Sequence, residues 1–168
     1  MRKAIVVVMI LVCAMTASAQ VGGKWKRITN YSNETGDKLM GVSVDSLSTV
    51  PADGIERTAT LIITANKGKP MLAMDFGGVW VIDVRESESW FDEAKDKPVK
   101  VVWVPKEKKC GDNPCTTLIS LSDELVKGMA KAQLFRIKFW ASNGKQYVHT
   151  FPVSSLSAHA KFLGLKLI

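Results

Sequence analysis

The sequence predicts a mainly β fold with a minor α+β component: an antiparallel β-sandwich-like domain covered by two short helices. Three observations support this prediction. Runs of β-branched and aromatic residues with period-two alternation outnumber helical patterns. These runs are short, and clusters of turn-forming residues separate them. No tract has the composition of an interdomain linker, so the chain of 168 residues is expected to hold one such domain.

The N-terminal segment, residues 1–19, has the pattern of a secretory signal peptide. Two basic residues precede an apolar run from Ala4 to Met15, and small residues stand at Ala17 and Ala19. The apolar run is shorter than the roughly 20 residues that cross a bilayer. We therefore expect cleavage before Gln20, a single domain over residues 20–168 with no integral membrane segment, and a periplasmic or secreted location.

Five strand-like segments are predicted in the first half of this domain. The clearest are 58–64 and 71–75, joined by a turn at 66–70, and a third covers 79–83 after a turn at 76–78. Weaker candidates lie at 24–29 and 39–45. Three tryptophans lie in or beside strand-like runs and are expected to pack in the core or at its edge: Trp80, Trp90 and Trp103.

Further strands are predicted at 99–104 and 116–120, and Lys106, Lys108 and Lys109 are placed in the loop between them. Cys110 and Cys115 flank Gly-Asp-Asn-Pro, a run of turn formers, so a disulfide between them is expected in an oxidising compartment. Closing so short a ring contributes roughly 2 kcal/mol before strain. Two cysteines without a nearby histidine fall short of a four-ligand metal site, so no metal is expected.

The first helix is predicted to begin after Ser122, whose side chain can cap it, and to end near Ala130. Two acidic residues in its first turn oppose the positive end of the helix dipole. Leu121 is expected to pack on Val126 as a hydrophobic staple.

The second helix is predicted to follow Pro152 and to stop at Gly164, a residue that adopts the left-handed conformation freely. Apolar residues recur there at intervals of three and four, as on one face of a helix: Val153, Leu156, Ala160 and Leu163.

The segment between these helices, 134–151, reads as a hairpin whose turn is Asn143-Gly144. A two-residue turn pairs Ser142 with Lys145, which places Trp140 opposite Tyr147 and Lys138 opposite His149. In this register the core face consists of Phe135, Ile137, Phe139 and Val148. The opposite face is the candidate binding surface and consists of Arg136, Lys138, Trp140, Tyr147 and His149.

Such a surface suits an anionic or aromatic partner, because cations supply charge and the aromatic rings supply stacking area. The alternative is that these side chains only stabilise the hairpin, since aromatic cross-strand pairs contribute about 0.2–1 kcal/mol without any ligand. Basic side chains also cover apolar surface with their methylene stems.

Charge and motif content exclude several functions. The net charge is +7, and +5 without Arg2 and Lys3, but the lysines are spread along the chain, so no nucleic-acid partner is expected. His149 and His159 are the two histidines, and His159 is expected to pack beside the second helix. No nucleophile elbow, zinc-binding histidine pair, phosphate-binding loop or dinucleotide fingerprint occurs. We expect neither an enzyme nor a cofactor.

An early Trp25, the paired-strand centre 71–83 with Val-Ile-Asp-Val-Arg at 81–85, and Trp90 resemble features of two bacterial families. Three later segments strengthen the likeness: 121–129, 135–140 and Phe-Pro-Val-Ser-Ser-Leu at 151–156. The chain resembles the invasion-associated locus B family and the accessory periplasmic proteins of type VI secretion clusters. This resemblance implies an exported, mostly β envelope protein that acts by binding and is linked to secretion or host interaction.

The expected function is therefore that of an exported cell-envelope binding or accessory protein with an envelope or secreted protein as partner. An alternative is an inhibitor of an exported hydrolase, presenting the loop around Asp112 and Asn113. A small hydrolase ranks third, and it would need His149 or His159 beside a carboxylate in a concave pocket.

Overall fold

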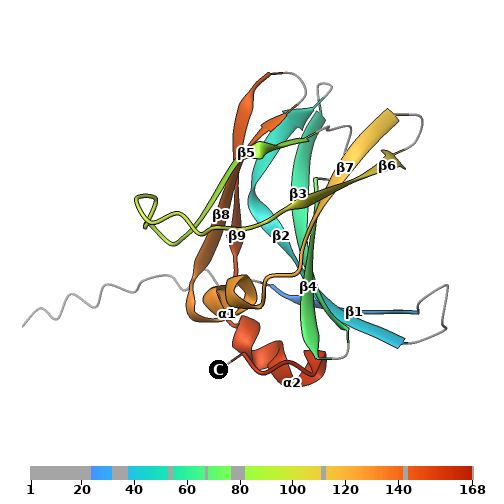
Figure 1. Cartoon of the computed structure of the whole chain (residues 1–168). Helices are drawn as coiled ribbons and strands as arrows, with labels where there is room; N and C mark the ends of the chain where they lie inside the picture. Colours follow the sequence, from blue (N-terminus) through green and yellow to red (C-terminus); the bar gives the residue numbers. More distant parts are fainter. Residues whose placement is uncertain are drawn as a thin grey trace, which may run out of the picture.

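The computed structural model describes residues 24–31, 38–52, 55–66, 68–76, 82–110, 113–141 and 144–167. It shows two antiparallel sheets that face each other, with helical segments gathered at one end (Figure 1). The prediction of a mainly β sandwich-like domain with two short helices is confirmed. The predicted signal peptide, residues 77–78 of the turn and residues 79–81 of the predicted strand, Trp80 among them, lie outside the described residues.

The larger sheet has six strands in the order β1-β2-β3-β4-β7-β6, and the smaller has three in the order β5-β8-β9. The strands of the larger sheet are β1 (Lys26–Tyr31), β2 (Lys38–Ala52), β3 (Ile55–Asn66), β4 (Lys69–Asp75), β6 (Val104–Cys110) and β7 (Asn113–Ser120). Those of the smaller sheet are β5 (Ile82–Phe91), β8 (Leu134–Ala141) and β9 (Gln146–Pro152).

Alternating side chains of both sheets meet in one core. Along β4 and β8 every second residue is buried, which is the pattern of a strand with one covered face. Phe76 follows β4 and packs on Phe139 of β8, with ring centroids 4.6 Å apart. Trp90 and Trp103 are buried, as predicted.

A bulge in β2 joins the two sheets along one side. The β2–β3 register shifts between Asp45 and Thr49, so this part of β2 departs from regular pairing. Within the bulge, the Ser48 hydroxyl donates to the Val148 carbonyl and accepts from the Thr150 amide of β9, both at 3.3 Å. Strand β2 therefore pairs in the larger sheet and also hydrogen-bonds to the edge of the smaller one.

Helix α1 (Asp123–Lys131) begins where predicted and ends one residue beyond Ala130. The Ser122 hydroxyl caps it by accepting the Leu125 amide at 3.1 Å. The expected staple is wrong: Val126 is buried, but Leu121 is 75 % exposed and turns to the surface.

The second helical segment is a short 3-10 turn, η1 (Leu156–His159), followed by one turn of α-helix, α2 (Ala160–Leu163). It ends at Gly164 with a φ of +66°, as predicted. Val153 precedes the helical turn and is buried in the core. Both helical segments close the same end of the sandwich (Figure 1).

Most predicted strands are confirmed within β1, β2, β3, β4 and β7, but the prediction for 99–104 is wrong. Only Val99 forms a bridge, to Ser89, and the strand proper begins at Val104. Lys106, Lys108 and Lys109 were expected in a loop and lie in β6 instead. Strand propensity is high in 99–104 and low in 105–110, which is rich in lysine, so the position of the partner β7 and not propensity decides which part pairs.

Replacing Gly128 with alanine should destabilise the fold, although alanine favours helix by about 1 kcal/mol. A Cβ at this position of α1 would overlap the ring of Phe91. We expect Gly128→Ala to lower the free energy of unfolding by about 1–3 kcal/mol in urea titration. Lys127→Ala on the exposed face is the control, with a change of about 0.5 kcal/mol or less. A stabilised G128A variant would contradict the packing described.

Candidate functional site

The outer face of the larger sheet carries an apolar row that crosses four strands. Ile62 of β3 lies opposite Ala73 of β4, which lies opposite Ile119 of β7, and Ile119 lies opposite Val104 of β6. The neighbours of these residues along each strand, such as Leu61, point into the core. The solvent face of an antiparallel sheet is usually polar, so this row is an exception.

The row is bounded on one side by polar side chains. Asp45 accepts hydrogen bonds from the Lys26 ammonium at 2.8 Å and from the Thr60 hydroxyl at 2.9 Å. The hydrogen bond from Lys26 is the main reason why the pKa of Asp45 lies below its usual value. These groups satisfy each other and leave the apolar row as the distinct feature of the face.

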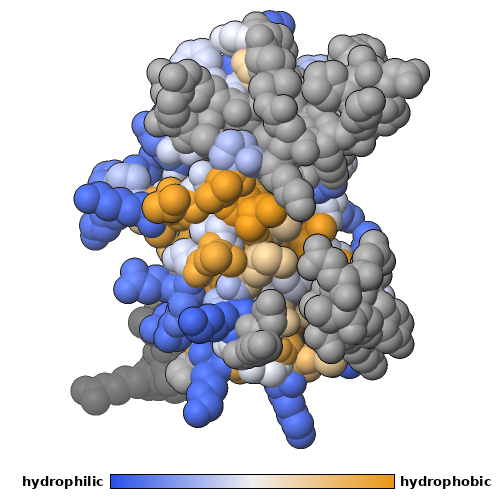
Figure 2. Space-filling view, turned by 45° about the vertical axis from the view of Figure 1, so that its right-hand side comes forward, coloured by the Kyte–Doolittle hydropathy of each residue, from blue (hydrophilic) through white to orange (hydrophobic). Residues whose placement is uncertain are grey.

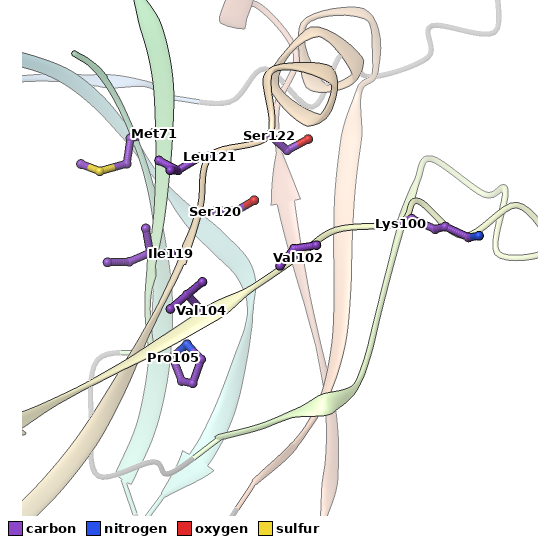
Figure 3. Close-up of a pocket in the computed structure, with 9 residues that line it drawn as sticks. All are labelled: Met71, Lys100, Val102, Val104, Pro105, Ile119, Ser120, Leu121 and Ser122. Carbon is purple, nitrogen blue, oxygen red and sulfur yellow. The ribbon is translucent and has the colours of Figure 1, made fainter.

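The apolar row opens into a groove of about 740 Å³. One wall is the segment 100–105 and the other is 119–122, where the chain leaves β7 for α1 (Figure 3). Nine residues line it: Met71, Lys100, Val102, Val104, Pro105, Ile119, Ser120, Leu121 and Ser122. Figure 2, which turns the right-hand side of Figure 1 forward, shows hydrophobic surface in the middle of that side.

Three apolar side chains of this groove are unusually exposed: Val102 at 80 %, Leu121 at 75 % and Val104 at 58 %. Its volume falls within the range of about 300–1,000 Å³ found for small-molecule sites. Lys100 is the one charged residue among the nine and stands apart at one end (Figure 3). The groove therefore offers apolar contact with few polar groups.

The two hydroxyls of the groove have limited freedom. Ser120 is 2 % exposed, and Ser122 already accepts the Leu125 amide as the cap of α1. Neither stands beside a histidine or a carboxylate among the lining residues. The lining thus lacks the base that would activate a serine nucleophile.

The predicted register of the 134–151 hairpin is wrong by one residue. Tyr147 lies opposite Phe139, not Trp140, and His149 lies opposite Ile137, not Lys138. A one-residue slip moves every side chain of one strand to the other face of the sheet.

The turn explains the slip. The Ala141 amide donates to the Lys145 carbonyl at 3.0 Å, and the Gly144 amide donates to the Ala141 carbonyl at 2.9 Å. Three residues therefore separate the closing pair, where the prediction had two. Gly144 has a φ of +74°, as the last residue of a three-residue loop requires.

The slip divides the predicted binding residues between two faces. Arg136, Lys138 and Trp140 share the outer face with Val148, which was expected in the core and is 39 % exposed. Tyr147 turns inward and packs on Phe139, and His149 is buried. The structure thus brings together three of the five predicted residues and removes two.

Both cations of the outer face are paired within the chain. The Arg136 guanidinium lies 2.7 Å from the Glu93 carboxylate, and the Lys138 ammonium lies 2.5 Å from that of Glu88, its cross-strand partner. Their side chains are only 16 % and 18 % exposed. These charges are neutralised by the fold, which weakens the case for an anionic partner at this face.

His149 belongs to an aromatic cluster in the core. Its ring lies 5.5 Å from Phe139 and 5.7 Å from Phe76, centroid to centroid. Burial lowers its pKa to about 4, and a hydrogen bond with the Ser48 backbone opposes that shift. The imidazole is therefore neutral at pH 7. Burial also lowers the pKa of His159, which packs near Trp25 as a packing histidine would.

The cysteine prediction stays a prediction. The β6–β7 register places Cys110 opposite Asn113 and Cys115 opposite Lys108, so the two cysteines occupy diagonal positions. Their side chains, together with Gly111 and Asp112, lie outside the described residues. Within the described ranges, no cluster of three or more metal-ligating side chains occurs.

Comparison with protein-family models, with curated proteins and with solved structures finds no match. The two family resemblances noted in the sequence therefore stay predictions. The groove is the feature that sequence reasoning missed. The sequence signal for the groove is the alternation of Lys100, Val102 and Val104 with inward-facing residues. Leu121 is a second signal, because this apolar residue is exposed.

The depressed pKa of His149 makes the fold sensitive to acid. Below the unfolded value of 6.5 the unfolded chain binds a proton that the folded chain resists, so stability is complete above pH 6.5 and is lost as pH falls toward 4. The loss attributable to this residue approaches about 3 kcal/mol at pH 4. Urea titrations of wild type and His149→Gln at pH 7 and 4.5 should show a smaller pH dependence in the variant. If the free energy of unfolding changes equally between the two pH values in both proteins, the buried neutral imidazole is contradicted.

Proposed function

We propose that the protein is an exported, non-enzymatic binding protein of the cell envelope that holds a protein partner through the apolar groove. The observation that carries the proposal is the exposure of Val102, Val104 and Leu121 around one concavity. Contiguous exposed apolar surface rimmed by polar residues is typical of an interaction site. The leader pattern supports export, and the described part of the chain has no helix that could span a membrane.

The geometry favours the groove over the hairpin face as the binding surface. On the hairpin face Arg136 and Lys138 are engaged by carboxylates, whereas in the groove the apolar side chains face solvent. A hydrolase is disfavoured because His149 is enclosed by phenylalanines and not by a cleft. The inhibitor alternative depends on the loop at 110–115, and no observation in the described residues favours it.

Groove variants should lose the partner without losing the fold. A photo-crosslinking residue placed at Val102 is expected to give a discrete protein adduct in intact cells, and Leu121→Asp should abolish it, because a desolvated carboxylate opposes apolar contact. Both positions are exposed, so stability should change by about 0.5 kcal/mol or less. The measurement is adduct yield on a denaturing gel.

Ile55→Asp is the matched control, since Ile55 is 56 % exposed on another part of the surface. It should leave the adduct unchanged. An adduct that survives Leu121→Asp but disappears in a Lys138→Ala, Trp140→Ala double variant would contradict the proposal and move the site to the hairpin face.

Export is tested on the full chain with its own leader. Expression in a bacterium should place the protein in the periplasmic or extracellular fraction, with Gln20 as the new N-terminus by mass spectrometry. Ala19→Arg should leave an uncleaved precursor, because signal peptidase requires a small residue there. A cytoplasmic full-length product from the unchanged chain would contradict this part of the proposal.

A further inference from the structure

The segment 99–104 has the side-chain pattern of a β-strand without the pairing of one. Exposed and covered residues alternate along it: Lys100, Val102 and Val104 are exposed, while Val101 is partly covered and Trp103 is buried. This period of two is the strand period. Its sequence, Val-Lys-Val-Val-Trp-Val, is also strongly β-forming.

The backbone of this segment is nearly unpaired. The Val99 amide donates to the Ser89 carbonyl at 2.7 Å, which anchors one end to β5. Between there and Val104, residues 100–103 make no hydrogen bond to any other backbone group in the described part of the chain. Such a row of free amides and carbonyls is a template for pairing with another chain.

The groove lies where a pairing strand would run. Val104 pairs with Ile119, and this is the first pair of the β6–β7 ladder. Beyond that pair the two segments separate. Ser120 pairs with Leu72 of β4, whereas residues 100–103 cross toward the smaller sheet. The groove occupies this fork, between the segment around Val102 and the residues from Ile119 to Ser122 (Figure 3).

Charge indicates the composition of the occupant. The stretch 94–110, which contains the segment and β6, has two acidic residues, Asp96 and Glu107, and six lysines: Lys95, Lys97, Lys100, Lys106, Lys108 and Lys109. Lys100 is the charged residue of the groove lining, and it has no ion-pair partner among the described residues. Acidic side chains would complement this stretch, and apolar ones would complement the groove.

We propose that residues 100–103 bind an extended segment of the protein partner as an added β-strand. Its backbone pairs with the free amides and carbonyls, its apolar side chains enter the groove beside Val102 and Leu121, and an acidic side chain lies near Lys100. In this mode main-chain hydrogen bonds provide affinity and pockets for alternate side chains provide specificity. The inference rests on the proposed function and specifies how the partner is held.

The test uses the mature protein and a panel of capped hexapeptides of valine, isoleucine and phenylalanine that carry one glutamate each, placed at a different position in each peptide so that in some peptides it shares the face of the apolar side chains that enter the groove. At least one peptide should bind by fluorescence anisotropy and slow hydrogen exchange of alternate amides within 100–103, because only every second residue of a strand hydrogen-bonds to a given neighbour. The same peptide methylated at its backbone nitrogens keeps its side chains but loses its donors, and it should bind at least about tenfold more weakly.

Two variants separate backbone from side chain. Val102→Pro removes an amide that makes no described backbone hydrogen bond, so it should leave stability nearly unchanged and weaken the peptide at least about tenfold. Val102→Ala keeps the amide and should weaken binding less. The hydrogen-exchange and methylated-peptide measurements need no variant, so the test stands even if Val102→Pro fails to fold.

Several results would overturn the inference. Peptide binding without protection of amides 100–103, or equal binding of the methylated peptide, would mean that the groove receives side chains only. Protection of these amides in a dimer of the protein alone would assign the site to a second copy. If no peptide of the panel binds but the in-cell adduct at Val102 persists, strand addition is rejected and the proposed function is retained. If the adduct at Val102 still forms in the Leu121→Asp variant, the proposed function itself is rejected.

Discussion

The bulge in β2 is the constraint on which the sandwich depends. At Ser46 and Ser48 the strand stops pairing regularly with β3, and hydroxyl groups replace the lost ladder bonds. Ser46 accepts the Ala59 amide at 3.1 Å and donates to the Ser48 carbonyl at 2.7 Å. Ser48 then engages the backbone of β9. These hydroxyl groups thus pair with backbone groups at the junction where the two sheets meet, including the Ala59 and Thr150 amides.

A second crossing closes the other side of the sandwich and creates the groove. Asp92 follows β5 in a left-handed conformation, with a φ of +49°, and its carboxylate accepts the Gln133 and Leu134 amides, both at 2.9 Å. These hydrogen bonds hold Asp92 beside the start of β8, the strand that follows α1. The chain then turns away toward β6. It must then travel from the smaller sheet to the larger one, and residues 100–103 cover that distance without a neighbouring strand.

The two solvent-facing surfaces differ in what they leave unsatisfied. On the smaller sheet, Arg136 and Lys138 are each paired with a carboxylate of the same chain, Glu93 and Glu88, so these two charges need no partner protein. On the larger sheet, the apolar row ends in a fork where three apolar side chains are exposed and residues 100–103 make no backbone hydrogen bond within the described residues. A binding function belongs more naturally at the incomplete surface, because a partner there removes apolar area from water and supplies missing hydrogen bonds.

Local features of this fold follow from the sequence alone: the Ser122 cap, the left-handed stop at Gly164 and the period-two strands of the larger sheet each depend on residues within a few positions. Other features depend on partners far along the chain. The 134–151 hairpin was identified, but its faces were not, because two- and three-residue turns differ by one position and that position reverses inside and outside. The segment 99–104 has the sequence pattern of a strand, but a strand also needs a neighbouring strand to pair with. Strand β7 lies beside this segment only at Val104.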